Sequence, residues 1–284
     1  ISGGKSNDAN GTYSTVGGGF GNTASGGVDG FATVAGGSSN SATGDYSFIG
    51  GGASNSVTGD YSFIGGGASN SVTGDTSFIG GGFSNSITKA NSTISGGYNN
   101  TITNDQSTIG GGLGNDVAAL SATISGGNNN TIEVNGHRSS ITGGGGNTIT
   151  GAYSTIAGGR QLTLNGDNSF GFHANVADGT KSMTIAASKT AVFGNVDIWL
   201  ASNDNAPSAI RFYDQFNTAG PFPGSAKYVA LKAPNNVTAD QVYTLPADAP
   251  TSAGRPLTSS TSGVMSWGRR TIQLLNQNVD CGNL

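Results

Sequence analysis

The chain of 284 residues has few charges, few leucines and a single cysteine. Its one glutamate is Glu133, and only Leu113 and Leu120 precede residue 160. Glutamate and leucine are strong helix formers, so their scarcity argues against a helical protein. One cysteine, Cys281, excludes an internal disulfide and a cysteine-based metal cluster. No apolar run is long enough to span a bilayer, so we expect no membrane insertion.

Charge and glycine content narrow the class of protein further. The net charge is −4 and no basic stripe is present, which argues against nucleic acid and anionic membranes as partners. The 50 glycines follow no strict three-residue period, which excludes collagen. Regularly spaced isoleucine and valine exclude a disordered Gly/Ser tract.

An apolar residue followed by Gly-Gly two positions later recurs along the first 160 residues, and a second apolar residue follows it by eight positions. Eight of the ten intervals between the first apolar residues are 15 residues long. We name these residues the first anchors: Ile1, Val16, Val34, Ile49, Ile64, Ile79, Ile94, Ile109, Ile124, Ile141 and Ile156. The second anchors are Ala9, Ala24, Ala42, Val57, Val72, Ile87, Ile102, Val117, Ile132, Ile149 and Leu164. So short a period predicts a parallel β-roll (β-solenoid) of about eleven 15-residue coils.

Two further residue types keep the same period. The Gly-Gly turn never changes length, which predicts positive φ or a backbone too close to its neighbour for a Cβ atom. Asparagine stands two residues before almost every second anchor, so stacked coils should form a ladder of side-chain amides. Residues 1–4 match Ile94 to Gly97, and we therefore expect the repeat to extend upstream.

Side chains alternate between the two faces of a strand, so the Thr, Ser and Phe beside inward anchors should point outward. Phe48, Phe63 and Phe78 would then form an exposed column. Three stacked outward phenylalanines need a partner surface, and a coil with about two buried apolar side chains is thin. The sequence therefore predicts a homotrimer, intertwined or side by side, with these three residues as a candidate interface.

Two parts of the chain resemble known families. The repeat Asn-Ser-Val-Thr-Gly-Asp-Tyr-Ser-Phe-Ile-Gly-Gly-Gly (55–67) resembles the head repeat of YadA-like trimeric autotransporter adhesins, over roughly residues 1–171. That resemblance implies a left-handed β-roll assembled as a trimer. Residues 172–200 are interpreted as a transition segment.

Residues 201–284 are interpreted as a small β-rich C-terminal domain, which resembles a module of phage tail-fibre proteins. The motifs that carry the resemblance are Ile210-Arg211-Phe212-Tyr213-Asp214, Tyr228 to Pro234, Val242-Tyr243-Thr244-Leu245-Pro246 and Ser262 to Gly268.

No catalytic constellation emerges from the sequence, and we expect no enzyme activity, metal or cofactor. Asp45, Asp60 and Asp75 repeat at 15 residues, each after a glycine, which favours turn stabilisation over a cation site. His137 and His173 have no Cys or acidic residue at ligand spacing.

Surface contacts are predicted from aromatics and from insertions. Tyr13, Phe31, Tyr46 and Tyr61 share one register, where they could stack sugar rings or pack against a neighbouring subunit. Two coils are longer than the rest, in the same turn, by three residues (through Asp29) and by two (through His137 and Arg138). Such insertions line one edge of a solenoid as a binding face, or are tolerated surface variation.

The favoured interpretation is a non-enzymatic, trimeric fibre segment of a phage or phage-like particle, extracellular and part of the virion. Its expected partners are copies of itself, other tail or fibre proteins and a host cell-surface glycan. The first alternative is a bacterial adhesin head on the cell surface. The second is an ice-binding solenoid, because Thr101-Ile102-Thr103 and Thr148-Ile149-Thr150, with Ser-x-Thr in other coils, give regular hydroxyl columns.

Overall fold

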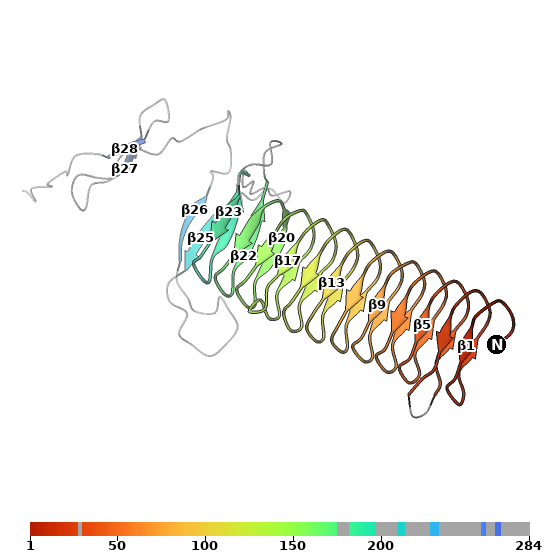
Figure 1. The fold of residues 1–284 in the computed structure, drawn as a ribbon. Helices are drawn as coiled ribbons and strands as arrows, with labels where there is room; N and C mark the ends of the chain where they lie inside the picture. The colour runs from red at the N-terminus through yellow and green to blue at the C-terminus, as the bar shows by residue number, and fades with distance from the viewer. Residues whose placement is uncertain are drawn as a thin grey trace, which may run out of the picture. The chain divides into compact units, whose positions relative to one another are not determined.

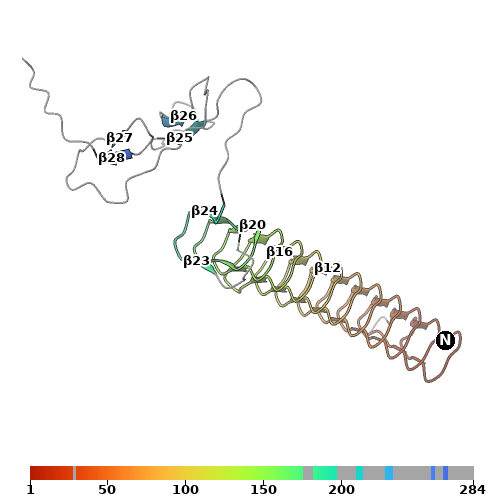
Figure 2. The same cartoon turned by 90° about the horizontal axis from the view of Figure 1, so that it is seen from above.

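The computed structural model describes residues 1–27, 30–174 and 182–196, together with the backbone of four later strands. The described residues between 1 and 196 form a parallel β-solenoid of about 11 turns of about 15 residues, which confirms the predicted all-β class. Figures 1 and 2 show its turns stacked as one continuous coil. Within the described residues no helix is long and apolar enough to cross a membrane.

Each turn contributes one strand to each of two twelve-stranded parallel sheets. The second-anchor sheet contains β1 (Asp8–Ala9), β3 (Thr23–Ala24), β5 (Ser41–Ala42), β7 (Ser56–Val57), β9 (Ser71–Val72), β11 (Ser86–Ile87), β13 (Thr101–Ile102), β15 (Asp116–Val117), β17 (Thr131–Ile132), β19 (Thr148–Ile149), β21 (Leu162–Leu164) and β23 (Met183–Ile185). The first-anchor sheet contains β2 (Thr15–Val16), β4 (Thr33–Val34), β6 (Phe48–Ile49), β8 (Phe63–Ile64), β10 (Phe78–Ile79), β12 (Thr93–Ile94), β14 (Thr108–Ile109), β16 (Thr123–Ile124), β18 (Ser140–Ile141), β20 (Thr155–Gly159), β22 (Phe170–His173) and β24 (Ala191–Gly194).

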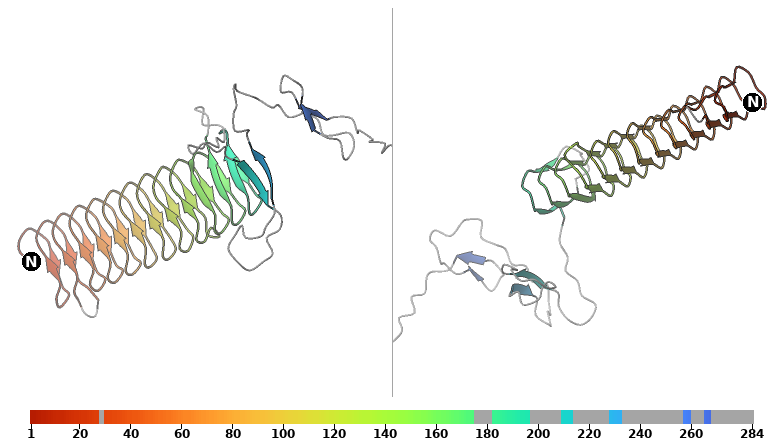
Figure 3. Two further views of the ribbon diagram at one scale, coloured as in Figure 1. Left: turned by 180° about the vertical axis from the view of Figure 1, so that it is seen from behind. Right: turned by 90° about the horizontal axis from the view of Figure 1, so that it is seen from below.

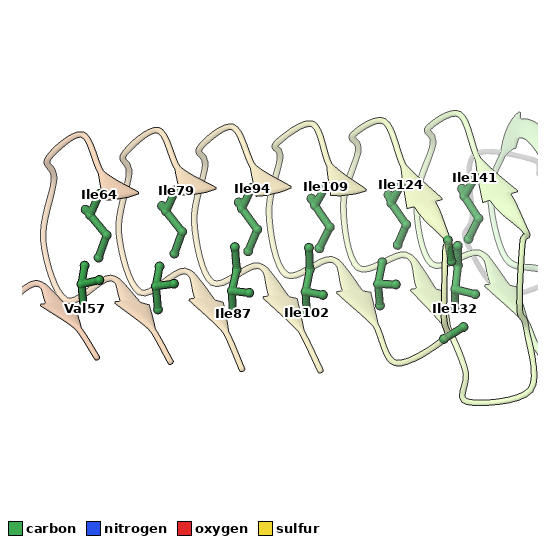
Figure 4. Close-up of a cluster of buried hydrophobic side chains, with 14 of the residues drawn as sticks. Val57, Ile64, Ile79, Ile87, Ile94, Ile102, Ile109, Ile124, Ile132 and Ile141 are labelled. Atoms are coloured by element: carbon green, nitrogen blue, oxygen red, sulfur yellow. The ribbon is translucent and has the colours of Figure 1, made fainter. Parts of the chain in front are cut away.

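The core is a double row of anchors between the two sheets. From Val16 to Leu164 every anchor is fully buried, as predicted, whereas Ile1 is exposed and Ala9 is partly buried. Figure 4 shows the two rows facing each other, with Ile87 and Ile102 opposite the row of Ile79, Ile94 and Ile109. Corresponding anchors of neighbouring coils lie next to each other because the strands pair in register, for example Ile79 with Ile94. Burial of these aliphatic side chains holds the sheets together.

The stack continues beyond residue 171, where the sequence repeat ends. Strand β23 pairs with β21, and β24 pairs with β22, both in parallel. Met183 and Ile185 pack against the end of the core. The described part of the expected transition segment, residues 182–196, thus adds a further level to both sheets. Backbone pairing needs no particular side chain, so the fold can outlast the repeat.

Asparagine side chains form the predicted ladder along the inside of the Gly-Gly turn. The Nδ2 group of Asn70 donates to the carbonyl oxygens of Gly66 and Gly82, both at 3.0 Å. Its Oδ1 accepts the backbone N–H of Asn85 in the next coil at 3.0 Å. The same contacts recur in a series of Asn22, Asn40, Asn55, Asn70, Asn85, Asn100, Asn115, Asn130 and Asn147, all buried.

Close stacking at this turn explains its glycines. Gly67 has a φ of +84°, and a Cβ there would lie 2.1 Å from the carbonyl oxygen of Gly82 in the next coil. Gly66 beside it has no left-handed φ, and its nearest neighbour would be 4.0 Å away. The backbone geometry therefore requires glycine at position 67 but not at position 66.

A second ladder, of serine hydroxyls, runs beside the opposite turn and was not foreseen from the sequence. Ser62 is buried, and its hydroxyl donates to the carbonyl oxygen of Gly74 at 2.9 Å. The hydroxyl oxygen of Ser62 also accepts the backbone N–H of Ser77 at 3.0 Å. The buried serines that donate to the next coil are Ser62, Ser77, Ser92, Ser107, Ser139, Ser154 and Ser169. Ser47 is also buried, but its hydroxyl donates to Gly44 of its own coil.

The chain divides into two compact units, Ile1–Ile198 and Trp199–Leu284. In the second unit β25 (Ala209–Tyr213) pairs with β26 (Tyr228–Lys232), and β27 (Leu257–Ser259) with β28 (Met265–Trp267), both antiparallel. The motif Val242 to Pro246 lies outside the described residues.

Replacing Asn70 by alanine should lower the stability of the solenoid. The Gly66 carbonyl and the amide of Asn85 would lose their partners, at about 1–3 kcal/mol for each unsatisfied group, whereas the Gly82 carbonyl keeps the backbone N–H of Ala68. We expect the free energy of unfolding in urea to fall by about 2 kcal/mol or more, because two groups are left unsatisfied. The control is Thr58→Ala, at an exposed position. Equal losses in the two variants would contradict a stabilising ladder.

Adjacent glycines provide a matched pair. Gly67→Ala places a methyl group against the carbonyl of Gly82 at a left-handed φ, and should destabilise by more than about 1 kcal/mol. Gly66→Ala meets open space and should be neutral, or stabilise by a few tenths of a kcal/mol to about 1 kcal/mol. Thermal melts of both variants test this, and the reverse order of stability would refute it.

Candidate functional site

The residue before each first anchor lies on the outer surface of the first-anchor sheet, and we name this series the face column. In it Phe48, Phe63 and Phe78 stack with ring centroids 4.9 and 5.1 Å apart and interplanar angles of 4° and 6°. Each ring leans over the glycine two residues later: a Cβ at Gly80 would lie 3.4 Å from Cε1 of Phe78. Phe78 is 39% exposed and the other two are half-buried. The three rings form an apolar ridge along the solenoid.

The aromatic row Tyr13, Phe31, Tyr46 and Tyr61 is also a stack, at the turn that precedes the face column. Its centroids are 4.4, 4.8 and 4.9 Å apart, with interplanar angles of 16° or less. Tyr46 and Tyr61 have φ values of 57° and 55°, a conformation that bulky residues rarely adopt. Each ring covers the face of the next, so the rings within the row can offer only their edges and hydroxyl groups to another molecule. This arrangement favours packing against another surface over stacking of sugar rings between the tyrosines.

A third exposed series, which we name the bridge column, follows the Gly-Gly turn and was missed from the sequence. Single parallel bridges connect its members from coil to coil. Phe83 and Tyr98 stack at 5.3 Å, and Phe83, Tyr98 and Leu113 are 45%, 52% and 42% exposed. The column is Lys5, Phe20, Ser38, Ala53, Ala68, Phe83, Tyr98, Leu113, Asn128, Gly145 and Arg160. Its residue types vary, so only its constant position in the repeat could have revealed it.

The periodic aspartates act within the turn, as the sequence favoured. Oδ1 of Asp60 accepts the backbone N–H of Asp45 at 2.8 Å, and Oδ1 of Asp75 accepts that of Asp60 at 2.9 Å. His137 occupies the same place in its coil, where Nδ1 accepts the backbone N–H of Leu120 at 3.2 Å. We therefore assign His137 a turn-stabilising contact that the sequence did not predict. A repeat alignment that includes the insertion would place it in the aspartate column.

Both insertions fall in the turn that leads from a second-anchor strand to the next first-anchor strand, between β3 and β4 and between β17 and β18. They therefore belong to one edge of the solenoid, whose stacked coils are seen in Figures 1 and 3. Asp29, a predicted contact residue, lies outside the described residues. In the second insertion Val134 is 57% exposed. Arg138 donates to the hydroxyl of Tyr153 at 2.7 Å, and its guanidinium lies 5.5 Å from the centre of that ring. The cation–π contact holds Arg138 against the solenoid.

The second-anchor sheet has a different outer surface. Two adjacent columns of hydroxyl residues run along five successive coils, and we name them the hydroxyl face. One column is Ser41, Ser56, Ser71, Ser86 and Thr101, and the other is Thr43, Thr58, Thr73, Thr88 and Thr103. None of these ten residues is charged or aromatic, so this surface contrasts with the apolar ridge on the other sheet.

Acidic residues interrupt the hydroxyl face in the next two coils. Asp116 stands in register between Thr101 and Thr131. Its Oδ1 is buried without a hydrogen-bond partner among the described residues. Burial raises the pKa of the Asp116 carboxyl, and the negative charge of Glu133 raises it further.

The remaining histidine, His173, is buried at the end of the core. Its Nδ1 lies 2.8 Å from the carbonyl oxygen of Arg160, and Nε2 lies 3.2 Å from Nδ2 of Asn195. The carbonyl can only accept and the amide can only donate, which places the proton on Nδ1. This contact joins the last coils and leaves neither ring nitrogen free for a substrate.

Among the residues that the structure describes, no group of three His, Cys, Asp or Glu side chains could hold a metal ion. Comparison with known proteins finds no matching family and no matching curated protein. The candidate site is therefore a set of surfaces: the face column, the aromatic row, the bridge column, the hydroxyl face and the second insertion.

Replacing Asp116 by threonine, the residue of the neighbouring coils, should stabilise the solenoid at neutral pH. The folded-state pKa of Asp116 is raised, so the folded protein binds the proton more tightly than the unfolded chain does. The ionised carboxylate thus lowers stability above that pKa, and the penalty disappears as the pH falls below the ordinary aspartate value. We expect a higher urea midpoint for Asp116→Thr at pH 7 and a smaller difference from the parent at pH 3. Glu133→Gln, which removes the lesser cause, should give a smaller gain. A constant difference across pH would contradict this origin.

Proposed function

We propose that the chain is a non-enzymatic, trimeric segment of a phage or phage-like tail fibre, which holds a host-surface contact away from the particle. The observation that carries the proposal is the apolar ridge of Phe48, Phe63 and Phe78 on a rod of hydrogen-bonded coils. A straight row of large exposed apolar side chains is a liability for a free solenoid and an asset for an assembly of parallel rods. The tail-fibre-like motifs after residue 201 support a place in a particle.

The rod itself suits a spacer. The asparagine ladder connects coil to coil at one turn, and the serine ladder connects most coils at the other, so bending would stretch hydrogen bonds on one side. The described side chains with catalytic potential are engaged in such contacts: His137, His173 and the turn aspartates each bind backbone or amide groups. These contacts favour a mechanical or binding role over catalysis.

Host contact is proposed for the places where the repeat is broken. These are the two insertions and the C-terminal unit, because loops on a rigid scaffold are the usual place of recognition. Arg138 and Val134 supply one cationic and one apolar contact on the second insertion. Three copies of a weak glycan-binding contact on one trimer would increase the overall affinity for the host surface through avidity. The same observations support the alternative of an adhesin head on a bacterial surface, except for the tail-fibre-like motifs, which that alternative does not explain.

The hydroxyl face favours one second candidate, an ice-binding solenoid. Its ten Ser and Thr residues form an uncharged array with the spacing of the coils. An ice-growth assay separates the two functions: arrested crystal growth that is lost on replacing Thr58, Thr73 and Thr88 by Lys would support ice binding.

The proposed trimer is tested by light scattering on the parent chain and on a variant with Phe48, Phe63 and Phe78 all replaced by Ser. Each substitution removes roughly 1–3 kcal/mol of apolar burial, so the variant should dissociate at concentrations where the parent is trimeric. The control replaces Thr93, Thr108 and Thr123 of the same column by Ser and should stay trimeric. A monomeric parent would end the proposal.

Host contact is tested by binding of the intact trimer to bacterial cells and to a glycan array. Three variants are compared with it: the first insertion shortened by three residues, the second by two, and the chain without residues 201–284. Loss of binding in one variant places the contact there. Equal binding by all, or binding by none, would mean that this segment does not carry the receptor contact.

A further inference from the structure

The face column and the bridge column have opposite size patterns. In five coils, one of the two columns presents a large side chain and the other a small one. The pairs are Thr15 with Phe20, Phe48 with Ala53, Phe63 with Ala68, Thr93 with Tyr98, and Thr108 with Leu113. Phe78 and Phe83 mark the coil where the large side chain passes from the face column to the bridge column. The coil of Thr33 and Ser38 is small in both.

Neither column carries a charge between the coil of Val16 and the coil of Ile141. The basic residues of the bridge column, Lys5 and Arg160, stand at its two ends. Large residues of both columns are exposed or half-exposed, including Phe78, Phe83 and Tyr98. The lack of charge and the aromatic residues are features that these columns share with the buried centre of an interface.

Cyclic symmetry around an axis parallel to the solenoid explains a match coil by coil. In such a ring each copy stands at the same height, and a surface of one copy meets a different surface of the next. Large side chains must then face small ones at each height for the two surfaces to interdigitate. A two-fold axis perpendicular to the solenoid would instead set a column against its own reverse, and would not require complementary sizes within one coil.

We propose that the face column of one copy packs, coil against equal coil, on the bridge column of the next copy in a closed parallel ring. The occupant of both surfaces is thus a second copy of this chain. The proposal rests on the proposed trimer and adds to it which two surfaces meet and in which register.

Chemical cross-linking between two different single-cysteine variants tests the contact. In a Cys281→Ser background, Phe63→Cys and Ala68→Cys chains are produced separately and also co-expressed, then treated with a short bismaleimide. We expect covalently linked chains in the co-expressed sample and none in either variant alone. Co-expressed Phe63→Cys and Leu113→Cys are the control, because three coils at about 4.8 Å each separate them along the axis by about 14 Å.

The outcomes distinguish this contact from the trimer itself. A trimeric mass with no link between Phe63→Cys and Ala68→Cys chains overturns the contact and leaves the trimer standing. Links within Phe63→Cys alone or Ala68→Cys alone mean that a column meets itself, and also overturn it. A monomeric parent overturns both proposals.

Exchange of side-chain volume gives a second readout. Phe63→Ala leaves a gap and Ala68→Phe creates a clash, so each should raise the dissociation concentration of the assembly about tenfold or more. The double variant moves the large side chain to the other surface and should return toward the parent value. Additive losses in the double variant would contradict direct contact between the two positions.

Discussion

The side-chain amide of asparagine is the contact on which the rest of the solenoid depends. Each ladder residue binds backbone groups of its own coil and of the next, so it fixes both the shape of one turn and the distance between turns. That distance brings a carbonyl within 2.1 Å of where a Cβ of Gly67 would lie, which is why the turn keeps its glycine. Insertions consequently appear only at the opposite turn, where Asp60, His137 and similar acceptors serve one neighbour each.

Much of this architecture was predictable because it repeats. The anchors, the Gly-Gly turn and the asparagine ladder recur at one period, and each recurrence is a separate confirmation within a single sequence. Apart from the serine ladder, what escaped prediction is set by stacking and leaves no constant residue type. The left-handed φ of Tyr46 and Tyr61 is imposed by the neighbouring coils against local preference. The bridge column varies from Ala53 to Tyr98 for the same reason: its backbone position is fixed, and its side chain is free.

The two sheets carry different outer surfaces although they share one core. On the first-anchor sheet, phenylalanine replaces threonine in three successive coils and forms a ridge. On the second-anchor sheet, serine and threonine continue through those same coils. A solenoid can vary each outer column without disturbing its anchors, because inward and outward residues alternate. The residues that vary from coil to coil therefore determine the outer surface of the solenoid, and the constant residues determine its fold and stability.

The direction of the hydrogen bonds between coils has a mechanical consequence. They run along the axis of the rod, so a pull on its two ends loads every junction between coils in series, while the bonds within one junction share the load in parallel. The rupture force is then that of the weakest junction and does not grow with the number of coils. Lengthening such a rod by duplication adds reach and compliance, and one defective coil limits the whole.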